Sequence, residues 1–367
     1  MITCPNVKVN LGLSVLRRRP DGYHDIETVF VPYFGFHDTL EIIAGDDFSR
    51  TSASLFARYG TAVSGCSTPE NVCFADPTLK GPPSYDAEGG TVFRGTASMK
   101  PGPAHSPCET LSGSCTTDSR KPQLAQKISE DGKVMITIAR AEGVDWDPIK
   151  DLTVKAYALL DADYNLPPVK IYLEKTSPVG AGLGGGSSDA AFALKMLNDL
   201  FSLNLDDAAL AAYASRLGSD CAFFVYNRPM FGTGRGEILE PYRLEGIDFS
   251  GKGDDAGASY DLRVVVPEGV AVSTADAYRG ITPREANVGI NEAVGGSEPS
   301  SVAACPLQEA LSRPVPEWRG SLVNDFEMTV FAKFPEIAAV KQHLYDQGAA
   351  YAAMSGSGSS VFALFPR

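Results

Sequence analysis

The sequence predicts a two-domain α+β protein. Its 367 residues exceed the size of an average domain, and 44% of them are hydrophobic, which is enough for a sizeable core. Segments with strand and helix periodicity are interleaved, but they do not follow the strict strand–helix–strand repeat of a doubly wound sheet. We therefore expect an α+β architecture with domains at 1–240 and 241–367.

The first part of the chain is expected to consist mainly of strands. Apolar side chains alternate with other residues over 7–13, which predicts a strand over 2–16 with one buried face. Arg, Pro, Asp and Gly residues over 17–22 indicate a turn. Further strands are expected at 27–34 and 39–43.

A segment of different composition follows at 51–122. Gly, Pro, Ser and Thr make up 35 of its 72 residues, so it can bury little apolar surface. We expect a long surface insertion without a catalytic role. The chain has seven cysteines, an odd number, and those in this segment lack the CxxC spacing of a zinc site. No disulfide framework or metal site is therefore expected at Cys66, Cys73, Cys108 and Cys115.

Beyond this segment the pattern of apolar residues again indicates strands and helices. Strands are expected at 134–140, 169–174, 221–225, 237–239 and 262–266. Helices are expected at 149–160, 187–201, 204–217, 323–331 and 335–346. Two strands joined by a Gly-Ser turn are expected to close the chain over 351–365.

The charge of the chain limits its partners. Lys and Arg number 32 against 45 Asp and Glu, for a net charge of −13, so no overall positive field attracts nucleic acid or an anionic membrane. Residues 1–16 lack the pattern of a signal peptide, and no apolar run approaches the ~20 residues that span a bilayer. We expect a cytoplasmic protein that binds neither nucleic acid nor membrane, and we predict no protein partner.

A glycine-rich loop is the strongest chemical signal in the sequence. Its five glycines permit close approach to a ligand, and the helix expected after it directs free N–H groups and a positive dipole end into the loop. Ser187 and Ser188 could cap this helix or help to hold a phosphate-bound Mg²⁺. The expected phosphate site comprises Pro178, Val179, Gly180, Ala181, Gly182, Leu183, Gly184, Gly185, Gly186, Ser187 and Ser188.

Three other phosphate-binding patterns fit this loop less well. Its GxGxxG spacing occurs in dinucleotide sites, but those need a strand after the helix, ending in an acidic residue, and here a second helix is expected. The Gly-Lys-Ser/Thr of a P-loop does not occur in the chain. The glycine loop of protein kinases lies between two strands rather than before a helix.

Three further features each leave two interpretations open. Lys8 and Asn10 share one face of the first strand, which could be a functional or simply a solvated face. Asp220 lies between a helix and an apolar segment, as catalytic residues often do, but an ordinary turn Asp would lie there too. The Gly-Ser segment 354–360 could contribute to a site or form a plain hairpin turn.

Taken together, these segments resemble the three motifs of the GHMP kinases, a family of ATP-dependent small-molecule kinases. The motifs correspond to residues 5–11 (PNVKVNL), 178–189 (PVGAGLGGGSSD) and 354–360 (MSGSGSS). The resemblance spans almost the whole chain outside the 51–122 segment. It implies a ribosomal protein S5 domain 2-like N-terminal domain, an α+β C-terminal domain, ATP as co-substrate and Mg²⁺.

Residues 19–24 (RPDGYH), the triple glycine and residues 322–327 (LVNDFE) are similar to one branch of this family. That branch phosphorylates the 2-hydroxyl of a CDP-linked methylerythritol in non-mevalonate isoprenoid biosynthesis. The alternatives are a GHMP kinase of the homoserine or mevalonate type, a non-catalytic ATP-binding sensor on the same fold, and an NAD-dependent oxidoreductase.

The resemblance also implies roles for individual residues. Asp220 matches the aspartate that accepts the proton of the substrate hydroxyl, and Lys8 matches the lysine that stabilises negative charge nearby. The glycine loop would wrap the ATP phosphates. Asn10, Tyr23 and His24 would line the cytidyl pocket, and Tyr278 would stack on cytosine.

The composition of the 51–122 segment leads to a prediction. Replacing it by a short flexible linker should leave a folded, active enzyme, because the segment can bury little apolar surface. Circular dichroism and kinase assays of the shortened protein measure the outcome. An unfolded or inactive product would show that the segment belongs to the fold or the site.

Overall fold

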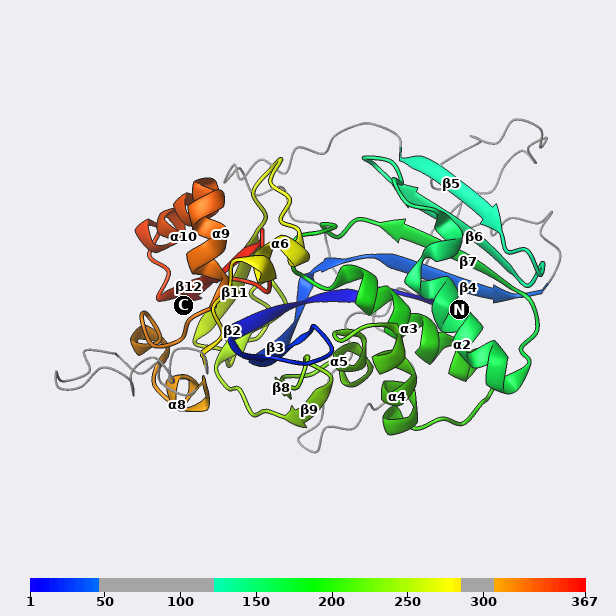
Figure 1. The fold of residues 1–367 in the computed structure, drawn as a ribbon, viewed down its shortest axis with the longest axis horizontal. Helices are drawn as coiled ribbons and strands as arrows, with labels where there is room; N and C mark the ends of the chain where they lie inside the picture. Colours follow the sequence, from blue (N-terminus) through cyan, green and yellow to red (C-terminus); the bar gives the residue numbers. More distant parts are fainter. Residues whose placement is uncertain (46–121, 285–306) are drawn as a thin grey trace, which may run out of the picture.

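Three β-sheets with flanking helices form the part of the protein that the structure describes (Figure 1). The computed structural model describes residues 1–45, 122–284 and 307–367. The expected insertion and its four cysteines therefore lie outside the described residues, apart from residue 122. Within the described part, no helix is long and apolar enough to cross a membrane.

The first sheet supports the helix that follows the glycine loop. In spatial order its strands are β1 (Ile2–Thr3), β4 (Thr39–Ala44), β7 (Val169–Lys175), β6 (Val134–Arg140) and β5 (Gln123–Ile128). Only the β6–β7 pair among these is parallel, and the crossover between them contains 3₁₀ turn η1 (Pro148–Lys150) and α2 (Leu152–Tyr164). Helices α3 (Gly185–Leu200) and α4 (Asp207–Leu217) join α2 over a core that includes Ile42, Ile136 and Ile171.

The second sheet carries the first motif. Its strands, in order, are β2 (Asn6–Arg18), β3 (His24–His37), β8 (Met230–Thr233) and β9 (Ile238–Pro241). The register of β2 against β3 shifts at Gly12, whose φ is +67°. Before this shift Leu11 packs in one apolar cluster, and after it Leu13 packs in another. The expectation of a single buried face over 7–13 is therefore wrong, because the bulge re-aims the strand.

The third sheet lies between the second sheet and a helical layer. Its strands are β10 (Ile247–Asp248), β11 (Tyr260–Val265), β13 (Val361–Pro366) and β12 (Tyr351–Met354). Along β12, Tyr351 and Ala353 pack toward β2 and β3, whereas Ala352 and Met354 pack toward the helices, as the two-residue period of a strand requires. Around this sheet are α6 (Thr274–Arg279), α8 (Leu307–Leu311), η2 (Val315–Glu317), α9 (Phe326–Lys333) and α10 (Pro335–Asp346).

Most expected elements are confirmed within a few residues, but the strand expected at 221–225 is wrong. The segment forms helix α5 (Cys221–Tyr226), which ends at Asn227 in a left-handed conformation. Its first five residues are apolar and buried against α3 and α4. A short run that is apolar throughout shows no periodicity, so packing rather than pattern decides between strand and helix. The domain division near residue 240 stays a prediction.

Candidate active site

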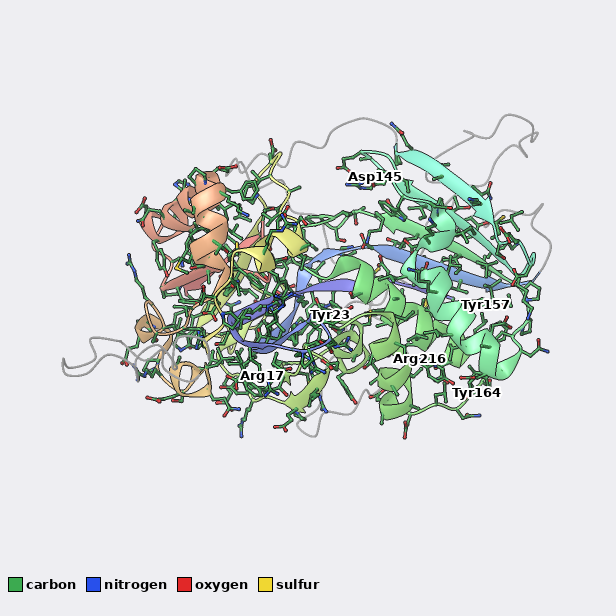
Figure 2. All side chains as sticks on the ribbon, viewed as in Figure 1. Arg17, Tyr23, Asp145, Tyr157, Tyr164 and Arg216 are labelled. Carbon is green, nitrogen blue, oxygen red and sulfur yellow. The ribbon has the colours of Figure 1, made fainter. Side chains whose placement is uncertain are left out.

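The three motif segments meet at a cavity of about 1420 Å³. Its walls come from β2, the β2–β3 connection, the glycine loop, the start of α3, the α4–α5 turn and α6. Figure 2 labels two residues from these walls, Tyr23 after β2 and Arg216 at the end of α4. The expected site residues that line the cavity are Lys8, Asn10, Tyr23, His24, Asp220, Tyr278 and residues 178–187 of the glycine loop. Ser188 is fully buried behind the lining.

The Lys8 side chain is buried beside the Asp220 carboxylate. Only 3% of Lys8 is exposed, and its Nζ lies 3.3 Å from Asp220 Oδ2. The same ammonium donates hydrogen bonds to Asn10 Oδ1 at 2.6 Å and to the Gly182 carbonyl at 3.1 Å. This arrangement excludes the interpretation of a solvated strand face. It places a cation and a carboxylate beside the glycine loop.

The glycine loop is held by backbone contacts with the other two motifs. Lys8 N–H donates to the Leu183 carbonyl at 2.9 Å, and the Ala181 carbonyl accepts from both N–H and Oγ of Ser360. A methyl group on Gly182 would lie 2.5 Å from the Ser355 carbonyl oxygen, and the φ of Gly182 is +77°. The Gly-Ser segment is therefore more than a plain hairpin turn, because it supports the loop from behind.

Helix α3 begins with free N–H groups at the cavity. Its N-cap residue is Gly184, with a φ of +71°, and no side chain of the described residues caps the helix. Of the two interpretations of Ser187 and Ser188, capping of this helix is wrong, because both residues lie within α3 rather than before it. The Ser188 hydroxyl has no hydrogen-bond partner among the described residues. Uncapped first-turn N–H groups and the helix dipole make this end of the cavity suited to phosphate.

Aromatic side chains form another part of the cavity. His24 stacks on Tyr278 with ring centroids 4.8 Å apart, and Tyr278 meets Phe326 edge-on at 4.7 Å. Tyr23 is 57% exposed, and the Arg235 guanidinium lies 5.1 Å from its ring. Because His24 already covers one face of Tyr278, a base would have to stack on the other face or on Tyr23.

The shifted pKa values of His24 and Tyr278 both favour the neutral side chain near pH 7. Burial, helped by the positive charge of Arg18, lowers the pKa of His24 below its ordinary value. A neutral imidazole offers one hydrogen-bond donor and one acceptor. Burial, with a smaller contribution from Asp220, raises the pKa of Tyr278 to about 12. These rings thus suit an uncharged aromatic ligand with polar edges.

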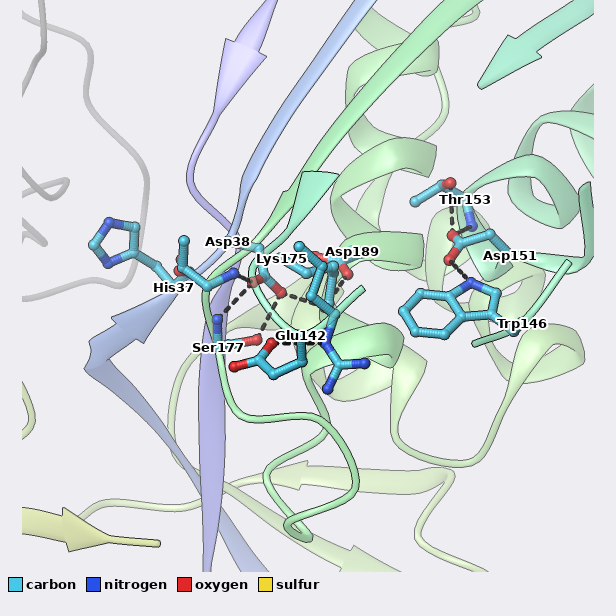
Figure 3. A network of polar contacts seen from close by, with 11 residues as sticks. His37, Asp38, Glu142, Trp146, Asp151, Thr153, Lys175, Ser177 and Asp189 are labelled. Atoms are coloured by element: carbon cyan, nitrogen blue, oxygen red, sulfur yellow. Dashed lines mark hydrogen bonds and ion pairs between the residues drawn. The ribbon is translucent and has the colours of Figure 1, made fainter. Parts of the chain in front are cut away.

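Some cavity residues were missed by the sequence analysis. Arg235 comes from the β8–β9 turn, where neighbouring glycines were the available signal. Trp146 lines the cavity and donates from Nε1 to Asp151 Oδ2 at 3.2 Å (Figure 3). It is one of two tryptophans in the chain, and it lies shortly before a helix, which could have marked it. Thr274 and Ser357 share a hydrogen bond at 3.0 Å that links α6 to the Gly-Ser segment.

Comparison with known proteins agrees with this geometry. The family model of the GHMP kinases N terminal domain matches residues 151–228, and that of the GHMP kinases C terminal domain matches 307–367. Curated relatives named 4-diphosphocytidyl-2-C-methyl-D-erythritol kinase match over 100% of this chain and 92% of their own length. They include proteins from Bacteroides fragilis at 36% identity, Parabacteroides distasonis at 35% and Cytophaga hutchinsonii at 33%.

Solved structures show the same fold. A crystal structure of 4-(cytidine 5'-diphospho)-2C-methyl-D-erythritol kinase has a TM-score of 0.55 and 26% identity, covering 99% of this chain and 90% of that one. The Methanococcus jannaschii mevalonate kinase has a TM-score of 0.52 at 10% identity, covering 100% of this chain and 90% of its own, which supports the fold alone.

The fold and the cavity define a small-molecule kinase of the GHMP class, as the three motifs predict. Within that class, the chain belongs to the family of 4-diphosphocytidyl-2-C-methyl-D-erythritol kinases.

The packing of the loop predicts the effect of Gly182→Ala. The new methyl group would meet the Ser355 and Gly358 carbonyls within 3 Å, and a positive φ costs a further ~1 kcal/mol or more. We expect the affinity for ATP to fall at least about tenfold, measured by calorimetric titration. Gly132→Ala, which has a similar φ of +70° but open space around it, is the matched control. Equal ATP affinity in both variants would refute the role of the close contact.

Proposed function

We propose that this chain transfers the γ-phosphoryl group of ATP to the 2-hydroxyl of 4-diphosphocytidyl-2-C-methyl-D-erythritol, a step of non-mevalonate isoprenoid precursor biosynthesis. The Lys8–Asp220 pair, 3.3 Å apart and facing the cavity, carries this proposal. Full-length relatives that bear this activity in their names support the choice of substrate.

In this mechanism Asp220 accepts the proton of the substrate hydroxyl. The oxygen then forms a bond to the γ-phosphorus, the bond from phosphorus to the β–γ bridging oxygen breaks, and ADP leaves. Lys8 stabilises the negative charge that is spread over the transferring group. Such transfer depends mainly on positioning and charge neutralisation, with a positioned base adding ~10²–10⁴-fold.

ATP binding is assigned to the glycine loop and the start of α3. Mg²⁺ would neutralise phosphate charge there, and it is commonly held by one or two protein ligands together with the phosphates. The described residues contain no group of three or more His, Cys, Asp or Glu side chains that could hold a metal ion. Ser187, which lines the cavity in the first turn of α3, is the hydroxyl we assign to the ion.

The cytosine of the acceptor is assigned to the aromatic part of the cavity. Its edge carries both hydrogen-bond donors and acceptors, which a neutral His24 can match. The exposed ring of Tyr23, backed by Arg235, offers a stacking surface, and Tyr278 holds His24 in place. Asn10 is assigned to the same pocket, because it lines the cavity and accepts a hydrogen bond from Lys8.

The substrate is tested by mass spectrometry of reactions that contain ATP and 4-diphosphocytidyl-2-C-methyl-D-erythritol, homoserine or mevalonate. A phosphorylated product from the cytidyl substrate alone is the expected result. Phosphorylation of homoserine or mevalonate instead would show a kinase with another substrate. It would refute the assignment of Tyr23 and His24 to the cytosine pocket. ATP binding without turnover of any substrate would indicate a non-catalytic sensor.

The role of Asp220 predicts that Asp220→Asn lowers kcat by ~10²-fold or more, because the amide cannot accept the proton. ATP affinity should change little, since Asp220 acts on the acceptor hydroxyl. Steady-state kinetics and calorimetry measure the two quantities. Asp276→Asn, at a half-exposed carboxylate on α6 outside the cavity lining, is the control. Near-normal turnover of Asp220→Asn would remove it from the role of base.

A further inference from the structure

A buried ionic network lies at the base of the glycine loop (Figure 3). Lys175, the last residue of β7, forms ion pairs with Asp38 and with Asp189, the latter at 2.6 Å. All three side chains are at most 4% exposed. None of them has a role in the chemistry assigned above.

This network joins the two ends of the glycine loop. Asp38 accepts hydrogen bonds from the N–H groups of Thr176 and Ser177 at 2.8 Å, and from the Ser177 hydroxyl at 2.7 Å, so it holds the segment that enters the loop. Asp189 lies in α3, the helix that leaves the loop. The Lys175 ammonium between the two carboxylates therefore fixes the separation of entrance and exit.

The network also lies close to the cavity. Lys175 and Asp189 both line it. A methyl group on Gly185, the first residue of α3, would lie 2.8 Å from Ser177 Oγ and 3.6 Å from Lys175 Nζ. The ammonium is thus placed directly beneath the helix N-terminus to which the phosphates are assigned.

The Lys175 ammonium keeps its positive charge within this network. Asp189 Oδ1 is buried without a hydrogen-bond partner among the described residues. Burial lowers the pKa of Lys175, but attraction to Asp189 and Asp38 outweighs it and leaves that pKa raised. The Lys175 cation is therefore retained.

We propose that Asp38, Lys175 and Asp189 are positioning residues for the triphosphate of the nucleotide, which keep the glycine loop and the first turn of α3 in their binding geometry. Buried ion networks are often no more stabilising than apolar side chains of similar volume, so stability alone does not explain one at this position. The inference rests on the proposed function, since it requires that the loop binds ATP phosphates.

Calorimetric titration with Mg-ATP tests the proposal without the acceptor substrate. Lys175→Met should weaken ATP binding by about tenfold or more, because it leaves the carboxylates without their cation beneath the phosphate site. Ser177→Ala, which removes one hydroxyl bond to Asp38 and no charge, should weaken binding by about threefold. In steady-state assays both variants should raise the KM for ATP with kcat nearly unchanged.

Two further variants separate positioning from folding. Lys133→Met removes the ion pair at 2.8 Å between Lys133, just before β6, and Asp161 in α2. Both residues lie outside the cavity lining, so ATP affinity should stay unchanged. Lys175→Met combined with Asp189→Asn relieves the repulsion between carboxylates, so it should fold like the wild type and still bind ATP weakly.

The outcomes separate this inference from the function on which it rests. A wild-type protein that fails to bind ATP would overturn both. If the wild type binds ATP, and the folded double variant and Ser177→Ala bind it equally tightly, the inference alone would be overturned. An equal loss of affinity in Lys133→Met would also overturn it, because the effect would then follow from general destabilisation.

Discussion

The close approach of two glycine-containing backbone segments is the constraint on which the rest of the site depends. The Ser355 carbonyl lies so near Gly182 that no side chain fits between them, and the Ala181 carbonyl is bonded to Ser360. These contacts join a loop of the first sheet to a turn of the third sheet. Since β2 also bonds to the loop through Lys8 N–H, the three motifs share one backbone framework. Side chains can then reach the cavity from fixed positions.

This framework resolves an apparent conflict between the acidic chain and its polyanionic ligand. The chain carries a net charge of −13, so the positive potential needed for a triphosphate must be built locally. The first-turn N–H groups of α3, the Lys8 ammonium and the buried Lys175 ammonium all lie around the glycine loop. The N–H groups belong to a helix, and both lysine side chains are buried. Binding of the ligand therefore requires little further ordering of these groups.

The sequence pattern correctly predicted the elements that have characteristic terminal residues and distinct apolar and polar faces. The helix expected at 335–346 begins with Pro335 at its first position and is observed as α10 with the same ends. The segment at 221–225 has neither property, and its burial against α3 and α4 makes it a helix. Strand β8 has four residues and was missed, because its state depends on pairing with β3 and β9 rather than on its own sequence.

Local pattern was enough to identify the types of residue at the site: glycines where the backbone must approach a ligand, and Lys8 and Asn10 on one strand face through the two-residue period. Which of these residues meet depends on the folding of distant segments against each other. The distance between Lys8 and Asp220, the stack of His24 on Tyr278 and the pairing of Lys175 with two carboxylates join segments far apart in the chain. Local periodicity carries no information about such partners, because they are chosen when separate apolar faces are buried against each other.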